Sequence, residues 1–132
     1  VATDFEHRSY AQELALCQRY YQVVVRASDY GSGIAPICNV VAYQTNNVFG
    51  VVEFPVTMRS APSLDAVSGT GYWKCFRNQG SGDFNSIQLD KISDSRLELN
   101  FYGASGTTID ADQPAWMRTN DSSAFIGLQA EL

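Results

Sequence analysis

The sequence predicts an all-β fold, an antiparallel β-sandwich of jelly-roll type, with one short helix near the N-terminus. Short runs of strand-forming residues recur roughly every 8–12 residues and are separated by clusters of Gly, Asn, Asp and Ser. Two of these runs alternate between apolar and polar side chains, which is typical of strands with one buried face. The sequence does not alternate helices with strands, so a parallel α/β fold is not expected.

The helix is expected directly before the first strand. Ser9 and Gln12 have the spacing of a capping box, in which each side chain bonds the backbone of the other residue. Tyr10, Leu14 and Cys17 fall on one side of the helix that follows. The helix can extend for only about two or three turns, because the next residues favour a strand.

Eight runs are predicted as strands: 19–26, 37–44, 48–54, 63–68, 71–77, 86–92, 96–102 and 124–132. Turns are predicted between them, at 29–33, 46–47, 68–71, 78–83, 103–106 and 119–123, where Gly, Asn, Asp and Ser gather. In 96–102 and 124–132 the alternation predicts which side chains face the core. They are Leu97, Leu99, Phe101, Ile126, Leu128, Ala130 and Leu132.

Length and composition indicate one folded domain over 1–132, in which 1–18 form an N-terminal segment. The chain is 45% hydrophobic and 17% charged, a balance that excludes intrinsic disorder. Its net charge of −5 argues against nucleic acid or an anionic membrane as partner. Its apolar runs are too short to cross a membrane, and the acidic start does not fit a signal peptide. We therefore expect synthesis in a cytoplasm, and Val1 fits either a chain cut from a longer protein or a GTG start codon.

The three cysteines, Cys17, Cys38 and Cys75, have a spacing that matches no zinc motif. Their odd number leaves at least one thiol unpaired. Buried free thiols of a reducing cytosol are the favoured interpretation, and a single disulfide is the alternative.

Few residues suit catalysis. His7 is the one histidine, and its neighbours Asp4 and Ser9 are too close along the chain to share the geometry of a catalytic triad. A contact at a sheet edge or between subunits is the favoured role for His7. No nucleophile elbow, phosphate loop or dinucleotide motif is present.

Two pairs of carboxylates are close in sequence. Asp110 with Asp112, or Asp90 with Asp94, could serve a glycosidase, and Asp110 with Asp112 could contribute to a calcium site. Both pairs lie beside turns, where aspartate commonly bonds the backbone. No catalytic residue, metal site or cofactor is therefore predicted.

Binding is the better-supported role, because the chain has seven Tyr, seven Phe and two Trp. Tyrosine and tryptophan offer a flat face with a polar edge, which suits sugar rings and protein interfaces. The candidates for ligand contact lie in or beside polar loops, and a core position is the alternative for each. They are Tyr30, Tyr72, Trp73, Tyr102 and Trp116. Most of the nine basic residues are arginine, which is enriched at interfaces, so we also expect an oligomer.

Three segments carry a resemblance to a known family. The run from Glu13 to Tyr21 reads Glu-Leu-Ala-Leu-Cys-Gln-Arg-Tyr-Tyr and resembles a module common in virion proteins of tailed bacteriophages. In that family an all-β domain with an Arg-x-x-Pro motif follows, and 54–62 looks like that motif through Arg59 and Pro62. The final Ala-Glu-Leu is similar to the last strand of such chains.

The resemblance implies a β-sandwich, commonly trimeric, on the exterior of a virion and made in the host cytoplasm. It brings no catalytic residues. The residues that it implies as scaffold or interface are Glu13, Cys17, Arg19, Tyr21 and Arg59. The expected partners are copies of the same chain in a homotrimer, other virion proteins and a host cell-surface glycan.

Three functions follow as hypotheses. The first is a non-enzymatic head domain of a tail fibre, whose loops bind a host-surface glycan or receptor. The second is a capsid decoration protein that stabilises the shell, in which aromatic and arginine side chains anchor an interface. The third is a fragment of a polysaccharide depolymerase, which only the carboxylate pairs support.

Overall fold

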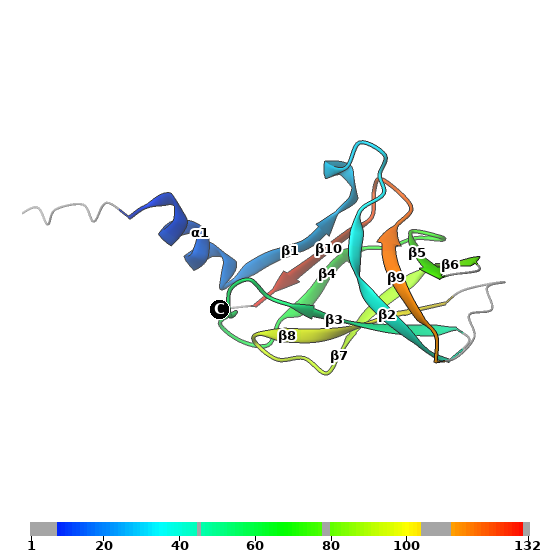
Figure 1. The fold of residues 1–132 in the computed structure, drawn as a ribbon. Coiled ribbons are helices and arrows are strands. Elements are labelled where there is room, and N and C mark those ends of the chain that lie inside the picture. Colours follow the sequence, from blue (N-terminus) through cyan, green and yellow to red (C-terminus); the bar gives the residue numbers. More distant parts are fainter. Residues whose placement is uncertain (1–7, 45, 78–79, 104–111, 131–132) are drawn as a thin grey trace, which may run out of the picture.

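The computed structural model describes residues 8–44, 46–77, 80–103 and 112–130 (Figure 1). In these ranges the chain forms α1 (Tyr10–Gln18), the 3-10 turn η1 (Ala27–Asp29) and ten strands. The strands are β1 (Tyr21–Arg26), β2 (Pro36–Gln44), β3 (Asn47–Glu53), β4 (Ser63–Val67), β5 (Trp73–Arg77), β6 (Gly80–Phe84), β7 (Ser86–Asp90), β8 (Arg96–Tyr102), β9 (Pro114–Thr119) and β10 (Phe125–Gln129). The predicted all-β fold with one short helix is confirmed.

The strands form two antiparallel sheets of unequal size. The small sheet has the order β1-β10-β4, and the large sheet has the order β6-β5-β9-β2-β3-β8-β7. Figure 1 shows the large sheet curving beside the small one. The core lies between the two sheets, because one cluster of buried side chains combines Val25 and Ile126 of the small sheet with Val40 and Leu99 of the large sheet.

The core-facing side chains predicted for two strands are confirmed, although Asn100 on the opposite side of β8 is buried as well. In β8, Leu97, Leu99 and Phe101 are buried, and in the last segment Ile126, Leu128 and Ala130 are buried. Since successive side chains of a strand point to opposite faces, each of these strands contributes every second residue to the core. Leu132, which was expected to continue the pattern, lies outside the described residues.

Two strands of the large sheet were not predicted. The sequence predicts a turn at 78–83, but Gly80–Phe84 forms β6, which pairs with β5 and places Asp83 opposite Lys74. Glycines hide a strand from propensity arguments because they have no side chain to alternate. The second missed strand is β9, which lies between β5 and β2. It begins at Pro114, a position where the missing backbone N–H interrupts no ladder.

The helix has the predicted capping box. The Gln12 backbone N–H donates to Ser9 Oγ at 3.3 Å, and the Ser9 N–H donates to Gln12 Oε1 at 2.9 Å. The helix ends at Gln18, where the chain turns into β1. None of the side chains of α1 is buried, and Figure 1 shows the helix extending away from both sheets.

The core is packed so tightly around Gly50 that it leaves no room for a side chain there. A Cβ at this position of β3 would lie 2.6 Å from Cys38 Sγ and 2.7 Å from the Asn39 carbonyl oxygen. Because the backbone of β2 cannot retreat without breaking its pairing, we expect Gly50→Ala to lower the free energy of unfolding by about 1–3 kcal/mol. Gly31→Ala is the control, since nothing lies within 4 Å of its Cβ. Equal stabilities of the two variants in chemical denaturation would contradict this packing.

Candidate functional site

The large sheet has an outer face, defined as its side that points away from the small sheet. On β9, Met117 and Thr119 are buried, whereas Trp116 between them is 58% exposed. Val41 on the adjacent β2 is 52% exposed, and Val51 on β3, the next strand, is 56% exposed. The outward side of a sheet usually carries polar residues, so grouped apolar side chains here indicate a binding surface.

Four open depressions of the described structure lie along the outer face, and they share lining residues. Asn39 lines three of them and Trp116 lines two. Their volumes range from about 500 Å³ to about 660 Å³. The depressions therefore form one broad surface across β5, β9, β2, β3 and β8, with two halves of different chemistry.

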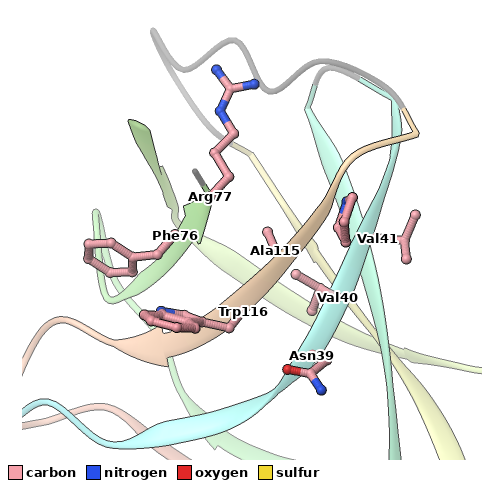
Figure 2. A pocket seen from close by; sticks show the side chains of 8 residues that line it. Asn39, Val40, Val41, Phe76, Arg77, Ala115 and Trp116 are labelled. Carbon is pink, nitrogen blue, oxygen red and sulfur yellow. The ribbon is translucent and has the colours of Figure 1, made fainter. Parts of the chain in front are cut away.

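The first half, the aromatic half, consists of Phe76, Trp116, Asn39, Arg77 and Arg118. Figure 2 shows Phe76 of β5 and Trp116 of β9 beside each other, with Asn39 on the adjacent β2. The ring centroids of Phe76 and Trp116 are 6.3 Å apart, at an angle of 43°. The Arg118 guanidinium carbon lies 3.5 Å from the Phe76 centroid, a cation–π contact that holds the charge next to the exposed tryptophan. Arg77 Nη1 donates to Gln113 Oε1 at 3.1 Å.

The second half, the acidic half, consists of Val41, Phe49, Val51, Glu53 and Glu98. These side chains border a depression of about 660 Å³ over β2, β3 and β8. In the register of the sheet Val51 lies opposite Glu98, so an exposed apolar side chain and a carboxylate stand side by side. Arg96 Nη1 approaches Glu53 Oε1 at 3.9 Å, a distance typical of a weak surface ion pair.

One predicted ligand contact is corrected by the structure. Trp73 is fully buried, its ring packs edge-on against Phe101 with centroids 5.9 Å apart, and its Nε1 donates to Ser68 Oγ at 3.2 Å. A ring with no exposed face cannot stack on a ligand. Trp73 is therefore a core residue rather than a ligand contact.

The other predicted contacts do not form one site. Tyr30 follows η1 and is 45% exposed. Tyr72 and Tyr102 are half-buried, and each is next to a glycine in the sequence. The Asn85 side chain links these two glycines, because it accepts a hydrogen bond from Gly71 N at 2.8 Å and donates one to Gly103 O. Trp116 is separate from all three, in the middle of a strand rather than in a loop.

Sequence reasoning missed Phe76 and Arg118 as neighbours of Trp116. Their proximity comes from the pairing of β5 with β9, in which Phe76 lies opposite Trp116 and Lys74 lies opposite Arg118. In 114–119 the residues Ala115, Met117 and Thr119 alternate with Trp116 and Arg118. This alternation is the signal that could have revealed strand β9 and its outward side chains.

The three segments of the family resemblance contact one another at one end of the small sheet. The Arg59 N–H donates to the Arg19 carbonyl oxygen at 2.8 Å, and the Ala130 N–H donates to the Tyr20 carbonyl oxygen at 2.8 Å. The Arg59 guanidinium carbon lies 5.8 Å from the Tyr20 ring centroid. Gln22 adds a buried amide whose Nε2 donates to Val56 O at 2.6 Å. These contacts define the base of the protein.

Tyr21 crosses the small sheet from β1 to β4. Its hydroxyl donates to Asp65 Oδ2 at 2.7 Å, and the ring passes over Gly127 of β10, where a Cβ would collide with the hydroxyl. Partial burial, and then the Asp65 carboxylate, raise the pKa of Tyr21 above its ordinary value. Glu13 and Cys17, the other predicted scaffold residues, lie on the exposed surface of α1, where Arg8 pairs with Glu13 at 3.4 Å.

Asp90, one of the carboxylates weighed as a catalytic group, makes local hydrogen bonds in a turn. Asp90 Oδ1 accepts from Lys91 N and Lys91 Nζ, each at 2.8 Å, and these hydrogen bonds lower the pKa of Asp90. His7 and Asp110 lie outside the described residues. Within those residues no cluster of three or more His, Cys, Asp or Glu is placed to hold a metal ion.

The three cysteines are unpaired and differ in environment. Cys17 is exposed on α1, whereas Cys75 is buried in the core. Burial raises the pKa of Cys38 to about 12 and also raises that of Cys75, so both remain protonated thiols at neutral pH. Cys38 and Cys75 flank Met117 in the register of the sheet, which makes them packing residues.

No protein family, no curated protein and no solved structure matches this chain. Within the described ranges, no helix combines the length and the apolar character that crossing a membrane requires. The outer face and the base are the two features of the described structure that bear on function.

The raised pKa of Tyr21 makes the free energy of unfolding depend on pH in the alkaline range. Because the folded chain holds this proton more tightly than the unfolded chain, the contribution is complete below the ordinary pKa of 10.0 and is lost as the pH rises through the higher pKa of the folded state. We expect the unfolding free energy of the native chain to fall more steeply above pH 10.0 than that of Tyr21→Phe. Denaturant titrations at several alkaline pH values measure both slopes, and equal slopes would contradict the Tyr21–Asp65 contact.

Proposed function

We propose that this chain is a non-enzymatic structural protein on the exterior of a phage virion, the head domain of a tail fibre that binds a host cell-surface glycan. The observation that carries the binding role is the exposed ring of Trp116, beside Phe76 and between polar side chains on the outer face. A flat aromatic ring covers the apolar face of a sugar, while neighbouring polar groups bond its hydroxyls. Asn39 and Arg77 line the same depression as Trp116 and supply such groups.

The basic residues of the aromatic half favour an acidic glycan. Arg118 lies beside Phe76 and Trp116, and Lys74 lies opposite Arg118 in the pairing of β5 with β9. Arg77 lines the same depression as Trp116, although Figure 2 shows its guanidinium directed away from the ring. Arginine binds carboxylate and phosphate groups through two parallel hydrogen bonds. These positive charges are local features of a chain with a net charge of −5, and screening confines their attraction to sugars within about 10 Å.

The virion part of the proposal is supported by the base of the protein. The three segments that resemble the phage module are distant in sequence, yet they contact one another through Arg19, Tyr20 and Arg59. Residues that work together in one structural element are expected to recur together in a module. The contacts give the resemblance a physical reason, since each segment needs the others for its backbone hydrogen bonds.

The non-enzymatic part is supported by the placement of the titratable groups. Displaced pKa values gather at a single site in most enzymes. Among the residues that the structure describes, they belong to Tyr21 on the small sheet, to the thiols of Cys38 and Cys75, and to the Asp90–Lys91 ion pair in a turn. Burial or a single adjacent partner explains each of them.

Removal of the Trp116 ring tests the glycan site. We expect Trp116→Ala to weaken glycan binding about tenfold or more, because stacking contributes on the order of 1 kcal/mol beyond the buried area. The ring is 58% exposed, so the free energy of unfolding should change by less than about 0.5 kcal/mol. A glycan array that includes uronic acid and neutral polysaccharides identifies the ligand, and calorimetry with the best ligand measures the loss.

Tyr30→Ala is the matched control, since Tyr30 is an exposed aromatic residue of a loop rather than of the outer face. Its binding should equal that of the unmodified chain. If Tyr30→Ala abolishes binding and Trp116→Ala does not, the glycan lies at the loops. If no glycan binds and the protein does not adsorb to host cells, the tail-fibre role is wrong.

A capsid decoration protein is the second candidate, and the same outer face favours it. Exposed Trp116, Val41 and Val51 would then anchor the chain on shell subunits, with the arginines at the rim of the interface. Virions that lack the protein should then lose resistance to heat or pressure. Unchanged resistance would remove this candidate.

A further inference from the structure

Three of the open depressions of the outer face follow one another along β2. The first is lined by residues 36–39 of this strand, the second by residues 39–41 and the third by residues 41–43. Their volumes lie between about 500 Å³ and about 570 Å³, and a space of that size is usual for one small ligand. Because neighbouring depressions share Asn39 or Val41, they form one continuous surface, which we call the β2 track.

Two exposed aromatic side chains stand at separate places on the β2 track. Trp116 is 58% exposed and lies opposite Asn39 in the pairing of β9 with β2. Tyr43 is 68% exposed, and its ring meets the Phe49 ring edge-on with the centroids 5.7 Å apart. The stretch of β2 from Asn39 to Tyr43 extends over about 13 Å. A single sugar ring is shorter than this, so the two aromatic rings can stack only on different sugars.

Polar side chains border the β2 track beside these rings. Asn39 supplies an exposed amide where the first two depressions meet. At one end Arg118 lines the same depression as Trp116 and brings a positive charge. At the other end Glu98 lines the depression of Tyr43, and a carboxylate accepts hydrogen bonds from hydroxyl groups. The track therefore suits an acidic sugar at Trp116 and a neutral sugar at Tyr43.

The chemistry of the β2 track fits a polysaccharide better than a peptide. Many proteins bind an extended peptide through backbone hydrogen bonds at the edge of a sheet. The strand β2 is not at an edge, because it pairs with β9 on one side and with β3 on the other. The track thus offers side chains alone, and flat rings with polar groups between them suit the faces and the hydroxyls of sugars.

We propose that the β2 track binds an internal stretch of a linear polysaccharide, several sugars long, laid along β2 from Arg118 to Tyr43. This extended binding mode rests on the glycan site proposed at Trp116 and specifies the form of its ligand. An acidic sugar stacks on Trp116 within reach of Arg118, and a neutral sugar of the same chain stacks on Tyr43. The second contact strengthens binding because its sugar is already tethered to the first.

The dependence of affinity on ligand length is the first test. Hyaluronan and alginate are linear polymers that contain uronic acid, and their fragments from disaccharide to dodecasaccharide serve as probes. If a glycan array selects another polysaccharide, its own graded fragments replace them. Calorimetry with the full chain should show an affinity that rises about tenfold or more with length and then levels off. Equal affinity for all lengths would overturn the extended binding mode and leave the glycan site at Trp116 intact.

Variants of Tyr43 test the far end of the β2 track. Tyr43→Ala should weaken binding of the dodecasaccharide about tenfold and leave that of the disaccharide unchanged, because the short fragment stays at Trp116. Tyr43→Phe keeps the ring and should keep the affinity for the long fragment. Tyr10→Ala is the matched control, since this tyrosine is 81% exposed on α1 rather than on the outer face. Equal losses in Tyr43→Ala and Tyr10→Ala would contradict the proposal.

Hydroxyl-radical footprinting locates the bound polysaccharide. The dodecasaccharide should protect both Trp116 and Tyr43 from oxidation, the disaccharide should protect Trp116 alone, and neither should protect Tyr10. Protection of Trp116 alone at every length would overturn the extended binding mode but not the proposed function. Binding of no polysaccharide would overturn both. If a capsid shell protein protects the two rings and no polysaccharide does, the β2 track is a protein interface and the proposal is wrong.

Discussion

A seven-stranded sheet that packs against a three-stranded sheet can bury only one of its faces, and this limit governs the rest of the structure. The buried face takes the alternate residues of β8, β9, β2 and β3, such as Leu99, Met117 and Val48. The opposite residues of the same strands must then face outward, whatever their chemistry. Here they include Trp116, Val41 and Val51, so the packing that forms the core also exposes an apolar surface. The candidate site is a direct consequence of the strand period.

At the base, a buried polar residue joins the helix to the small sheet. Gln22 points into the protein although its neighbours on β1 are strand-forming valines, and its amide donates both to the end of α1 and to the 54–58 loop. Tyr21, the next residue toward the helix, points outward and crosses to β4 above a glycine. Adjacent residues on opposite faces thus tie the same strand to two different segments.

Local signals predicted the parts of the fold that local physics determines. The capping box of Ser9 and Gln12 fixes the start of α1, and the strict alternation around Leu99 and Ile126 identifies two core strands. The strands β6 and β9 escaped because glycines and a leading proline mask the strand pattern, and their pairing depends on residues far away in sequence. Phe76 meets Trp116 only through that pairing. For the same reason Trp73 was interpreted as a ligand contact, since nothing in its own segment distinguishes an inward ring from an outward one.

The strand β6 has one further consequence, for how copies of this chain can aggregate. It is one of the two edge strands of the large sheet, and the unpaired backbone groups of an edge strand can template another strand. It spans only Gly80–Phe84, two of its residues are glycines, and Asp83 places a charge along it. Short, glycine-containing and charged margins of this kind resist the runaway strand addition that builds fibrils. The β6 edge of the large sheet is therefore protected against the addition of a strand from another molecule.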